Sequence, residues 1–294
     1  MLLLDLNISY SQVQPVKITT EKNDQSTVTF WCENTSNIVY SVKIKFSQLG
    51  DYINTNGEYI SEVRPGRSRI LELKPKVNPT NLSYSFNYYY SKGKYSAKPD
   101  SNFIYLLPIA ANKQVEIYPI NYIGNMVGKE NKTFFMQGFR FSQNDTLCAV
   151  RSGTVSEINT SGVVSSGYYN ANRNFIEIEQ RDGSVATYVI LDELIPIIKV
   201  GEKIMAGQAI GFLQAVDNKP KVNLRIDYLE GSMLEKEQAV PYINIKPKFL
   251  TENGIQVLGI KQNYKSIHSE EIITKEMSKK ELKKRQELLF GIKK

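Results

Sequence analysis

The chain has 294 residues, of which 41% are hydrophobic, and a formal net charge of +7 at pH 7. This length and apolar content predict one large or two ordinary domains with real cores. The dominant aromatic residue is tyrosine, with 18 copies against the single Trp31, and tyrosine favours strands over helices. No apolar run reaches the roughly 18 residues that a membrane-spanning helix needs.

The positive charge is concentrated at one end of the chain. Residues 275–294 hold eight Lys and Arg against three Glu, so about +5 of the net charge lies in this tail. The pattern predicts a charged appendage on a near-neutral body, and it argues against a nucleic-acid partner.

The first residues have the character of a processing segment. Residues 1–12 combine a short apolar stretch with the small residues Ser9 and Ser11, which resembles the end of a secretory signal. Asp5 interrupts the stretch and no basic residue precedes it, so we interpret residues 1–12 as a signal-peptide remnant, with an ordinary first strand as the alternative. The interpretation predicts an exported protein, periplasmic or associated with the cell envelope.

Residues 13–95 are expected to form a small all-β domain. Apolar and polar residues alternate in the segments 16–20, 26–33 and 39–46, as in half-buried strands, and turn-forming residues separate them. Several short strands at this spacing suggest an immunoglobulin-like β-sandwich. The aromatic residues of 84–90 would share one strand face, either packing on a core or offering a platform for stacking sugars. The polar, proline-containing residues 96–102 are predicted to be a linker.

The rest of the chain divides into a second β domain and a tail. Residues 103–250 contain many short strand-like runs punctuated by glycines, which predicts a folded-over antiparallel sheet or barrel. Residues 251–294 are expected to be a C-terminal extension that carries a basic amphipathic helix. Ser278 and Glu281 have the spacing of a capping box at its start. The helix could contact an anionic surface or simply be solvated.

The second domain resembles the LytM-type (lysostaphin-like) zinc metallopeptidases, which cleave peptide cross-links in bacterial peptidoglycan. The resemblance rests on motifs that follow one another in the family's order: Tyr105–Pro108, Gly138–Phe141, Asp145–Val155, Asn174–Gly183, Tyr188–Leu191, Val200–Gly211 and Asn223–Asp227. The segment Val200–Gly211 is the most diagnostic of them. The resemblance implies an all-β fold of the duplicated hybrid motif type.

The departures from the family pattern lie at the positions that carry its chemistry. Arg140 stands where the family has an aspartate ligand, and Asn223 and Arg225 stand where it has a pair of histidines. Ile190 and Gln180 replace two further histidines. No histidine occurs between Met126 and Met136, where the family's first ligand is expected.

A catalytic zinc needs three protein ligands and an open position for water. Two arginines near a dication would cost several kcal/mol each. The resemblance with these replacements therefore predicts a pseudoenzyme, with no zinc or other cofactor.

The same replacements suggest a binding site. Asn223 and Arg225 are two residues apart on one predicted strand and so share a face, and the resemblance places Arg140 nearby. Two guanidinium groups and an amide could hold a carboxylate. The alternative is that both arginines pair with local acids such as Asp227 or Glu179.

The remaining reactive residues point to no other chemistry. The single histidine, His268, lies outside the motifs and is expected to face solvent. Cys32 and Cys148 lie in different predicted domains, which favours buried free thiols over a disulfide.

We therefore expect a non-catalytic LytM-like module that binds peptidoglycan peptide or an envelope protein, such as an amidase. The alternative is a cell-wall hydrolase that uses unrecognised residues.

Overall fold

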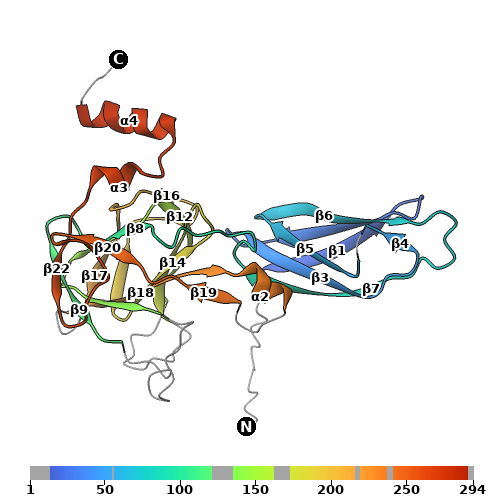
Figure 1. Cartoon of the computed structure of the whole chain (residues 1–294), viewed down its shortest axis with the longest axis horizontal. Coiled ribbons are helices and arrows are strands. Elements are labelled where there is room, and N and C mark those ends of the chain that lie inside the picture. The colour runs from blue at the N-terminus through green and yellow to red at the C-terminus, as the bar shows by residue number, and fades with distance from the viewer. Residues whose placement is uncertain are drawn as a thin grey trace, which may run out of the picture. The chain divides into compact units, whose positions relative to one another are not determined.

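A computed structural model describes residues 14–54, 56–120, 135–161, 173–215, 219–236 and 241–290. The chain divides into two compact units, Met1–Lys92 and Gly93–Lys294 (Figure 1). Both consist almost entirely of β-strands in curled sheets, and the all-β fold with a short C-terminal helix is confirmed. None of the helices in the described ranges is long and apolar enough to cross a membrane. The predicted signal remnant, residues 1–12, lies outside the described part.

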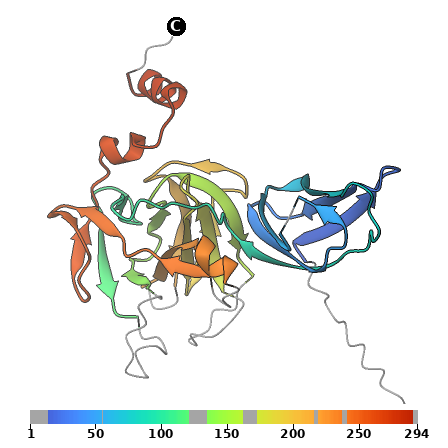
Figure 2. The same ribbon diagram turned by 45° about the vertical axis from the view of Figure 1, so that its right-hand side comes forward.

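Unit 1 contains two antiparallel sheets that face each other (Figure 2). The first has the order β1-β2-β6-β4, with bounds Val16–Lys22, Val28–Asn34, Gly66–Pro75 and Tyr52–Ile53. The second has the order β5-β3-β7, with bounds Glu58–Val63, Tyr40–Gln48 and Ser85–Lys92. One apolar cluster draws Phe30 from the first sheet and Val42 and Ile44 from the second. The unit is therefore a β-sandwich with its core between the sheets.

The aromatic strand of unit 1 packs inward. Tyr84, Phe86, Tyr88 and Tyr90 are partly buried against the unit's core. Phe86 lies edge-on to Phe30 with ring centroids 5.0 Å apart. Of the two alternatives for this stretch, the structure therefore has the core-facing strand.

Unit 2 is built on a nine-stranded sheet in the described residues, with the order β16-β12-β13-β14-β18-β10-β9-β22 and β19 paired to β18. The strands are, in that order, Lys203–Ile204, Gly153–Asn159, Asn174–Glu179, Val185–Ile190, Lys221–Leu229, Gln137–Arg140, Gln114–Tyr118, Asn263–Lys265 and Tyr242–Asn244. All of its pairings are antiparallel.

Two smaller sheets complete the unit. One has the order β11-β17-β15, with bounds Thr146–Cys148, Ala209–Gln214 and Glu193–Pro196. The other has the order β21-β20-β8, with bounds Gly254–Gln256, Lys248–Thr251 and Ile104–Leu106, and its β20–β8 pair is parallel. A single core joins all three sheets through residues such as Tyr188, Leu213 and Phe249.

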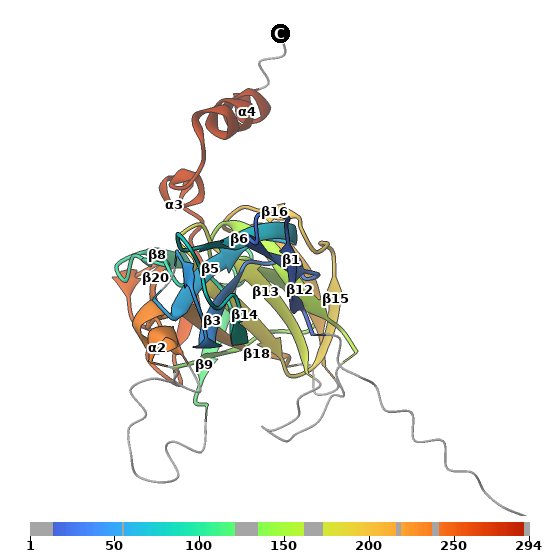
Figure 3. The ribbon, with the colours of Figure 1, turned by 90° about the vertical axis from the view of Figure 1, so that its right-hand side faces the viewer.

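Three helices lie in the described C-terminal third: α2, Gly231–Glu235; α3, Glu270–Thr274; and α4, Lys279–Phe290. The predicted capping box is present at the start of α4. Glu281 Oε2 accepts the Ser278 backbone N–H at 2.7 Å, and Ser278 Oγ accepts the Glu281 N–H at 3.3 Å. Both α3 and α4 lie beyond the end of the large sheet near β16 (Figure 3).

The residues after 250 are more than an appendage. β21 pairs with β20, and β22 adds to the edge of the large sheet beside β9. The helical segment after residue 269 projects from the sheets (Figure 1). Cys32 and Cys148 are both free and buried, as predicted.

Candidate functional site

Strand β10 lies between β9 and β18, and its glycine brings two polar side chains together. Gly138 is opposite Tyr118 on one side and Asn223 on the other, and residues opposite each other share a sheet face. A Cβ on Gly138 would lie 2.7 Å from the Tyr118 carbonyl oxygen and 3.0 Å from the Tyr118 ring. The missing side chain lets the ring cross β10, and the Tyr118 hydroxyl donates to Asn223 Oδ1. Asn223 is buried, and its side-chain oxygen already accepts this hydrogen bond from Tyr118.

Arg140 lies on the same face, two residues beyond Gly138. Its register partner on β9 is Glu116, and Arg140 Nη1 is 2.5 Å from Glu116 Oε1. The guanidinium also lies over the Tyr118 ring, 5.6 Å from its centroid. The side chain is 29% exposed, so this ion pair is reachable from solvent.

Arg225 is paired as well. Its Nε is 2.7 Å from Asp227 Oδ2, two residues along β18. The atoms are at ion-pair distance, but the N–H is not aligned for a hydrogen bond, so the contact is mainly Coulombic. Arg225 is 34% exposed. Of the two expectations from the sequence, the structure therefore agrees with the one in which both arginines pair with local acids. The acids are Glu116 and Asp227, whereas Glu179 pairs with Lys94.

The polar face continues around these three positions. Thr187 is opposite Arg225, and its hydroxyl donates to Glu177 Oε1 at 3.4 Å. Charged residues of both signs lie on this face: Lys221, Arg140 and Arg225 with Glu116, Glu177 and Asp227. The face has mixed charge and is not a purely cationic pocket.

The other two replaced positions lie on the opposite face. Ile190 is opposite Val222, one residue out of phase with Asn223, and its side chain is in the core. Gln180 follows β13 and is buried, and its Oε1 accepts the hydroxyl of Ser184 at 2.6 Å. Because successive strand residues point to opposite faces, the five motif positions do not form one site. The segment 126–136 lies mostly outside the described residues.

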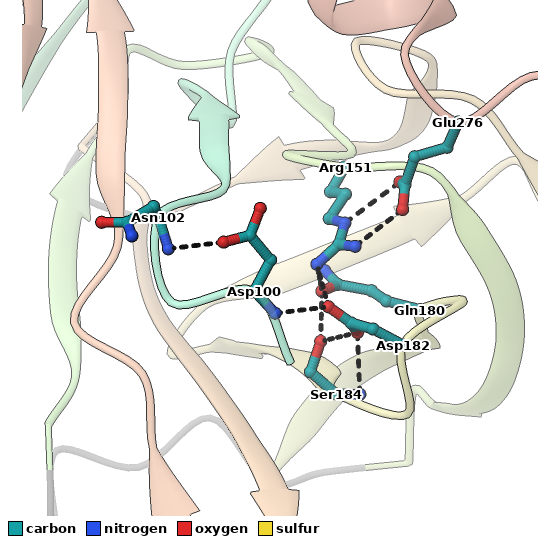
Figure 4. A network of polar contacts seen from close by, with 7 residues as sticks. All are labelled: Asp100, Asn102, Arg151, Gln180, Asp182, Ser184 and Glu276. Atoms are coloured by element: carbon teal, nitrogen blue, oxygen red, sulfur yellow. Dashed lines mark hydrogen bonds and ion pairs between the residues drawn. The ribbon is translucent and has the colours of Figure 1, made fainter. Parts of the chain in front are cut away.

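A buried arginine, Arg151, for which the sequence predicted no role, organises the region around Gln180 (Figure 4). Arg151 is 3% exposed and binds both oxygens of Glu276, with Nε–Oε2 3.0 Å and Nη2–Oε1 2.6 Å. Its Nη1 donates to Asp182 Oδ2 at 2.8 Å and to Gln180 Oε1 at 3.1 Å. The guanidinium lies over the Phe103 ring, 3.7 Å from the centroid. The network ties the segment before α4 to the sheet.

The charges in this network are mutually stabilising. Burial by itself would lower the pKa of Arg151, but hydrogen bonds to Glu276 and the charge of Asp182 raise it. Burial would raise the pKa of Asp182, but hydrogen bonds from Ser184 and the charge of Arg151 lower it. Arg151 and Asp182 are therefore both ionised at neutral pH. In the sequence, the position of Arg151 directly after the apolar Ala149–Val150 could have indicated that this arginine is buried.

His268 does not face solvent as expected. It is half-buried, and its Nε2 donates to the Ile109 carbonyl oxygen at 3.0 Å. Burial lowers the pKa of His268, partly offset by that hydrogen bond. The ring also lies against Gly207, where a Cβ would be 2.8 Å from Nδ1. Its surroundings are those of a packing residue. Across the described ranges, no three His, Cys, Asp or Glu gather as a metal site would require.

Comparisons with known proteins gave weak structural likenesses. No protein-family model and no curated protein matches the sequence. Among solved structures, the Helicobacter pylori protein Csd3 is similar in its orthorhombic crystal, with 12% identity, a TM-score of 0.31, and coverage of 95% of this chain and 78% of that one. In its hexagonal crystal the values are 11%, 0.30, 94% and 82%. A Pseudomonas aeruginosa chain described as a peptidase M23 has 9% identity and a TM-score of 0.28, over 63% of this chain and 82% of that one.

Proposed function

We propose that this chain is a non-catalytic, LytM-like module of the bacterial cell envelope that binds wall peptide or an envelope protein without zinc. One observation carries the proposal. Where the peptidase pattern needs an aspartate and two histidines, the chain has Arg140, Asn223 and Arg225 on one polar face. Each is engaged in a contact of its own, with Glu116, Tyr118 and Asp227 respectively.

These side chains do not fit a zinc ion. A guanidinium stays protonated and has no lone pair to offer a metal. The Asn223 oxygen already accepts the Tyr118 hydroxyl, and Asn223 is buried. A dication placed beside Arg140 and Arg225 would be repelled by both. The face is arranged for hydrogen bonds and ion pairs.

The mixed charge of the face favours a peptide that carries both carboxylates and amines. Arg140 and Arg225 are each about one-third exposed and can reach a ligand. Each also has a carboxylate neighbour, so a lone anion would have to compete with it. Cross-linking peptides of the cell wall contain charges of both signs and can pair with both the cations and the acids of the face. Export to the envelope, suggested by residues 1–12, would bring the face to this ligand.

The test is co-sedimentation of the full chain with purified insoluble peptidoglycan. We expect binding that the double substitution Arg140→Gln/Arg225→Gln weakens at least about tenfold. The matched control is Arg67→Gln in unit 1, since Arg67 is also a surface arginine paired with one glutamate, Glu21, at 2.7 Å. The control should bind like the unaltered chain.

Two results would count against the proposal. Released wall fragments, detected by mass spectrometry of the supernatant with zinc added, would indicate a hydrolase. Binding that survives Arg140→Gln/Arg225→Gln would show that the polar face is not the binding surface. Circular dichroism of each variant separates a binding defect from a folding defect.

A further inference from the structure

Unit 2 has a groove between α4 and the edge of the large sheet. Its volume is about 760 Å³. Helix α4 contributes Glu281, Lys284, Arg285 and Leu288, which share one helical face because they are spaced three and four residues apart. The opposite wall includes β16 and the turn after β13. None of the arginines of the polar face lines it.

Positive charge in the groove exceeds what its acids neutralise. Two of its three glutamates are already paired, Glu179 with Lys94 at 2.9 Å and Glu276 with Arg151 at 2.6 Å. Arg181, Lys203 and Lys284 are exposed and form no ion pair with any described residue. The pKa of Glu281 is lowered, first by hydrogen bonds from Ser278 and then by the positive charge of Lys203 and Arg181.

The groove also has apolar walls. Ile204, Met205, Met277 and Leu288 line it, and Met205 and Leu288 are 41% and 75% exposed. Exposed methionine side chains adapt to varied apolar partners. A purely ionic polymer would leave these side chains in water, whereas a peptide can cover them.

The helix wall is fixed by contacts of its own. Arg285 binds both oxygens of Glu270 in α3, at 2.6 and 2.9 Å. The Ser278–Glu281 capping box sets the start of α4, and the preceding Glu276 is anchored by Arg151. The wall is therefore held without using Lys284 or Leu288, which stay available to a ligand.

We propose that this groove binds an acidic, partly apolar segment of another protein. Its carboxylates would contact Arg181, Lys203 and Lys284, and its apolar side chains would cover Met205 and Leu288. The inference goes beyond the proposed function, because it assigns a second partner to a surface that Arg140, Asn223 and Arg225 do not line.

The experiment is fluorescence anisotropy of the full chain with a labelled peptide of about ten residues that alternates Glu and Leu. We expect saturable binding that Arg181→Glu/Lys284→Glu weakens at least about tenfold. The control matched to the Lys284→Glu half of this variant is Lys283→Glu, the same charge reversal on an exposed α4 residue outside the groove, and it should change binding less than about twofold. Peptides with Gln for Glu, or Ser for Leu, should each bind more weakly.

Three outcomes would overturn the proposal. The first is a lack of saturable binding. The second is an equal loss with Lys283→Glu, which would mean that only the charge of the tail matters. The third is polyphosphate or anionic phospholipid vesicles competing as well as the peptide, while the Ser-for-Leu peptide binds unchanged. Arg140→Gln/Arg225→Gln should leave peptide binding intact, so a failure here is distinguishable from a failure of the proposed function.

Discussion

Arg151 and Arg67 make the same kinds of contact in different surroundings. Each pairs with a glutamate and lies over an aromatic ring, Phe103 for Arg151 and Trp31 for Arg67. Arg151 is 3% exposed, whereas Arg67 is mostly exposed. A buried ion pair that loses one partner leaves an uncompensated charge away from water, and an exposed one does not. The same substitution should therefore lower stability more at Arg151 than at Arg67.

We predict that Arg151→Met lowers the free energy of unfolding of unit 2 by about 3 to 5 kcal/mol, because Asp182 and Glu276 lose their buried partner. Arg67→Met should cost under about 1 kcal/mol. Urea unfolding followed by circular dichroism measures the loss. Trp31, the single tryptophan, reports on unit 1 by fluorescence, and its transition should not move in Arg151→Met. Equal effects of the two substitutions would contradict the account.

Asp51 should make the stability of unit 1 depend on pH. Backbone N–H groups of Asn81 and Thr80, with the Thr80 hydroxyl, donate to its carboxylate and lower its pKa to about 2. The unfolded value is about 3.9. The contribution is therefore fully present above the unfolded pKa and is lost as pH falls from about 4 towards 2.

We predict that the difference in urea midpoint between the unaltered chain and Asp51→Asn, followed by Trp31 fluorescence, shrinks across this pH range. Asp24→Asn, in the exposed turn after β1, serves as control and should show no such trend. A difference for Asp51→Asn that stays constant with pH would rule out the assigned cause.

Some of these residue contacts could be predicted from the sequence and others could not. The two-residue spacing of Asn223 and Arg225 was enough to place them on one face. The partner Glu116 lies on β9 and meets Arg140 only because β9 and β10 pair. Ile190 illustrates the limit, since its motif position suggested the site while its register with Val222 places it in the core.

At the scale of elements, the turn between β13 and β14 depends on a glycine. Gly183 has φ +89°, and a Cβ there would lie 2.8 Å from the Ala97 Cβ. Gly201 has a similar φ of +86° but has open space around its Cβ position. Comparing alanine substitutions at the two glycines therefore distinguishes the cost of backbone strain from the cost of steric overlap.

We predict that Gly201→Ala costs about 1 to 2 kcal/mol from backbone strain alone. Gly183→Ala should cost about 1 to 3 kcal/mol more, because the added methyl overlaps Ala97. Urea unfolding of both variants, followed by circular dichroism, gives the comparison. Similar losses in the two variants would show that the turn can shift to accommodate a methyl group.

Sequence patterns predicted those strands and helices whose formation depends mainly on their own residues. Alternating residues marked β1, β2 and β3, and the Ser278–Glu281 spacing marked the start of α4. β22 was missed, because a three-residue strand has little pattern of its own and forms by adding to β9. Its presence extends the sheet into residues that composition alone assigned to a tail.

For the whole molecule, the sequence predicted two β units, and the structure divides the chain between Lys92 and Gly93. The predicted linker, residues 96–102, falls inside unit 2, where Asp100 N–H donates to Asp182 Oδ2 at 3.4 Å. Polar composition suggested a linker, but these polar groups pair within the unit. Composition cannot distinguish a solvated segment from one whose partners lie about 80 residues away.

We propose that this chain carries out no zinc chemistry. The measurement that tests this proposal is the zinc content of the purified full chain after equilibrium dialysis against zinc, with peptidoglycan digestion assayed on the same sample. We predict far less than one equivalent of bound zinc and no released wall fragments, while the chain still co-sediments with peptidoglycan. A full equivalent of zinc together with released fragments would contradict it.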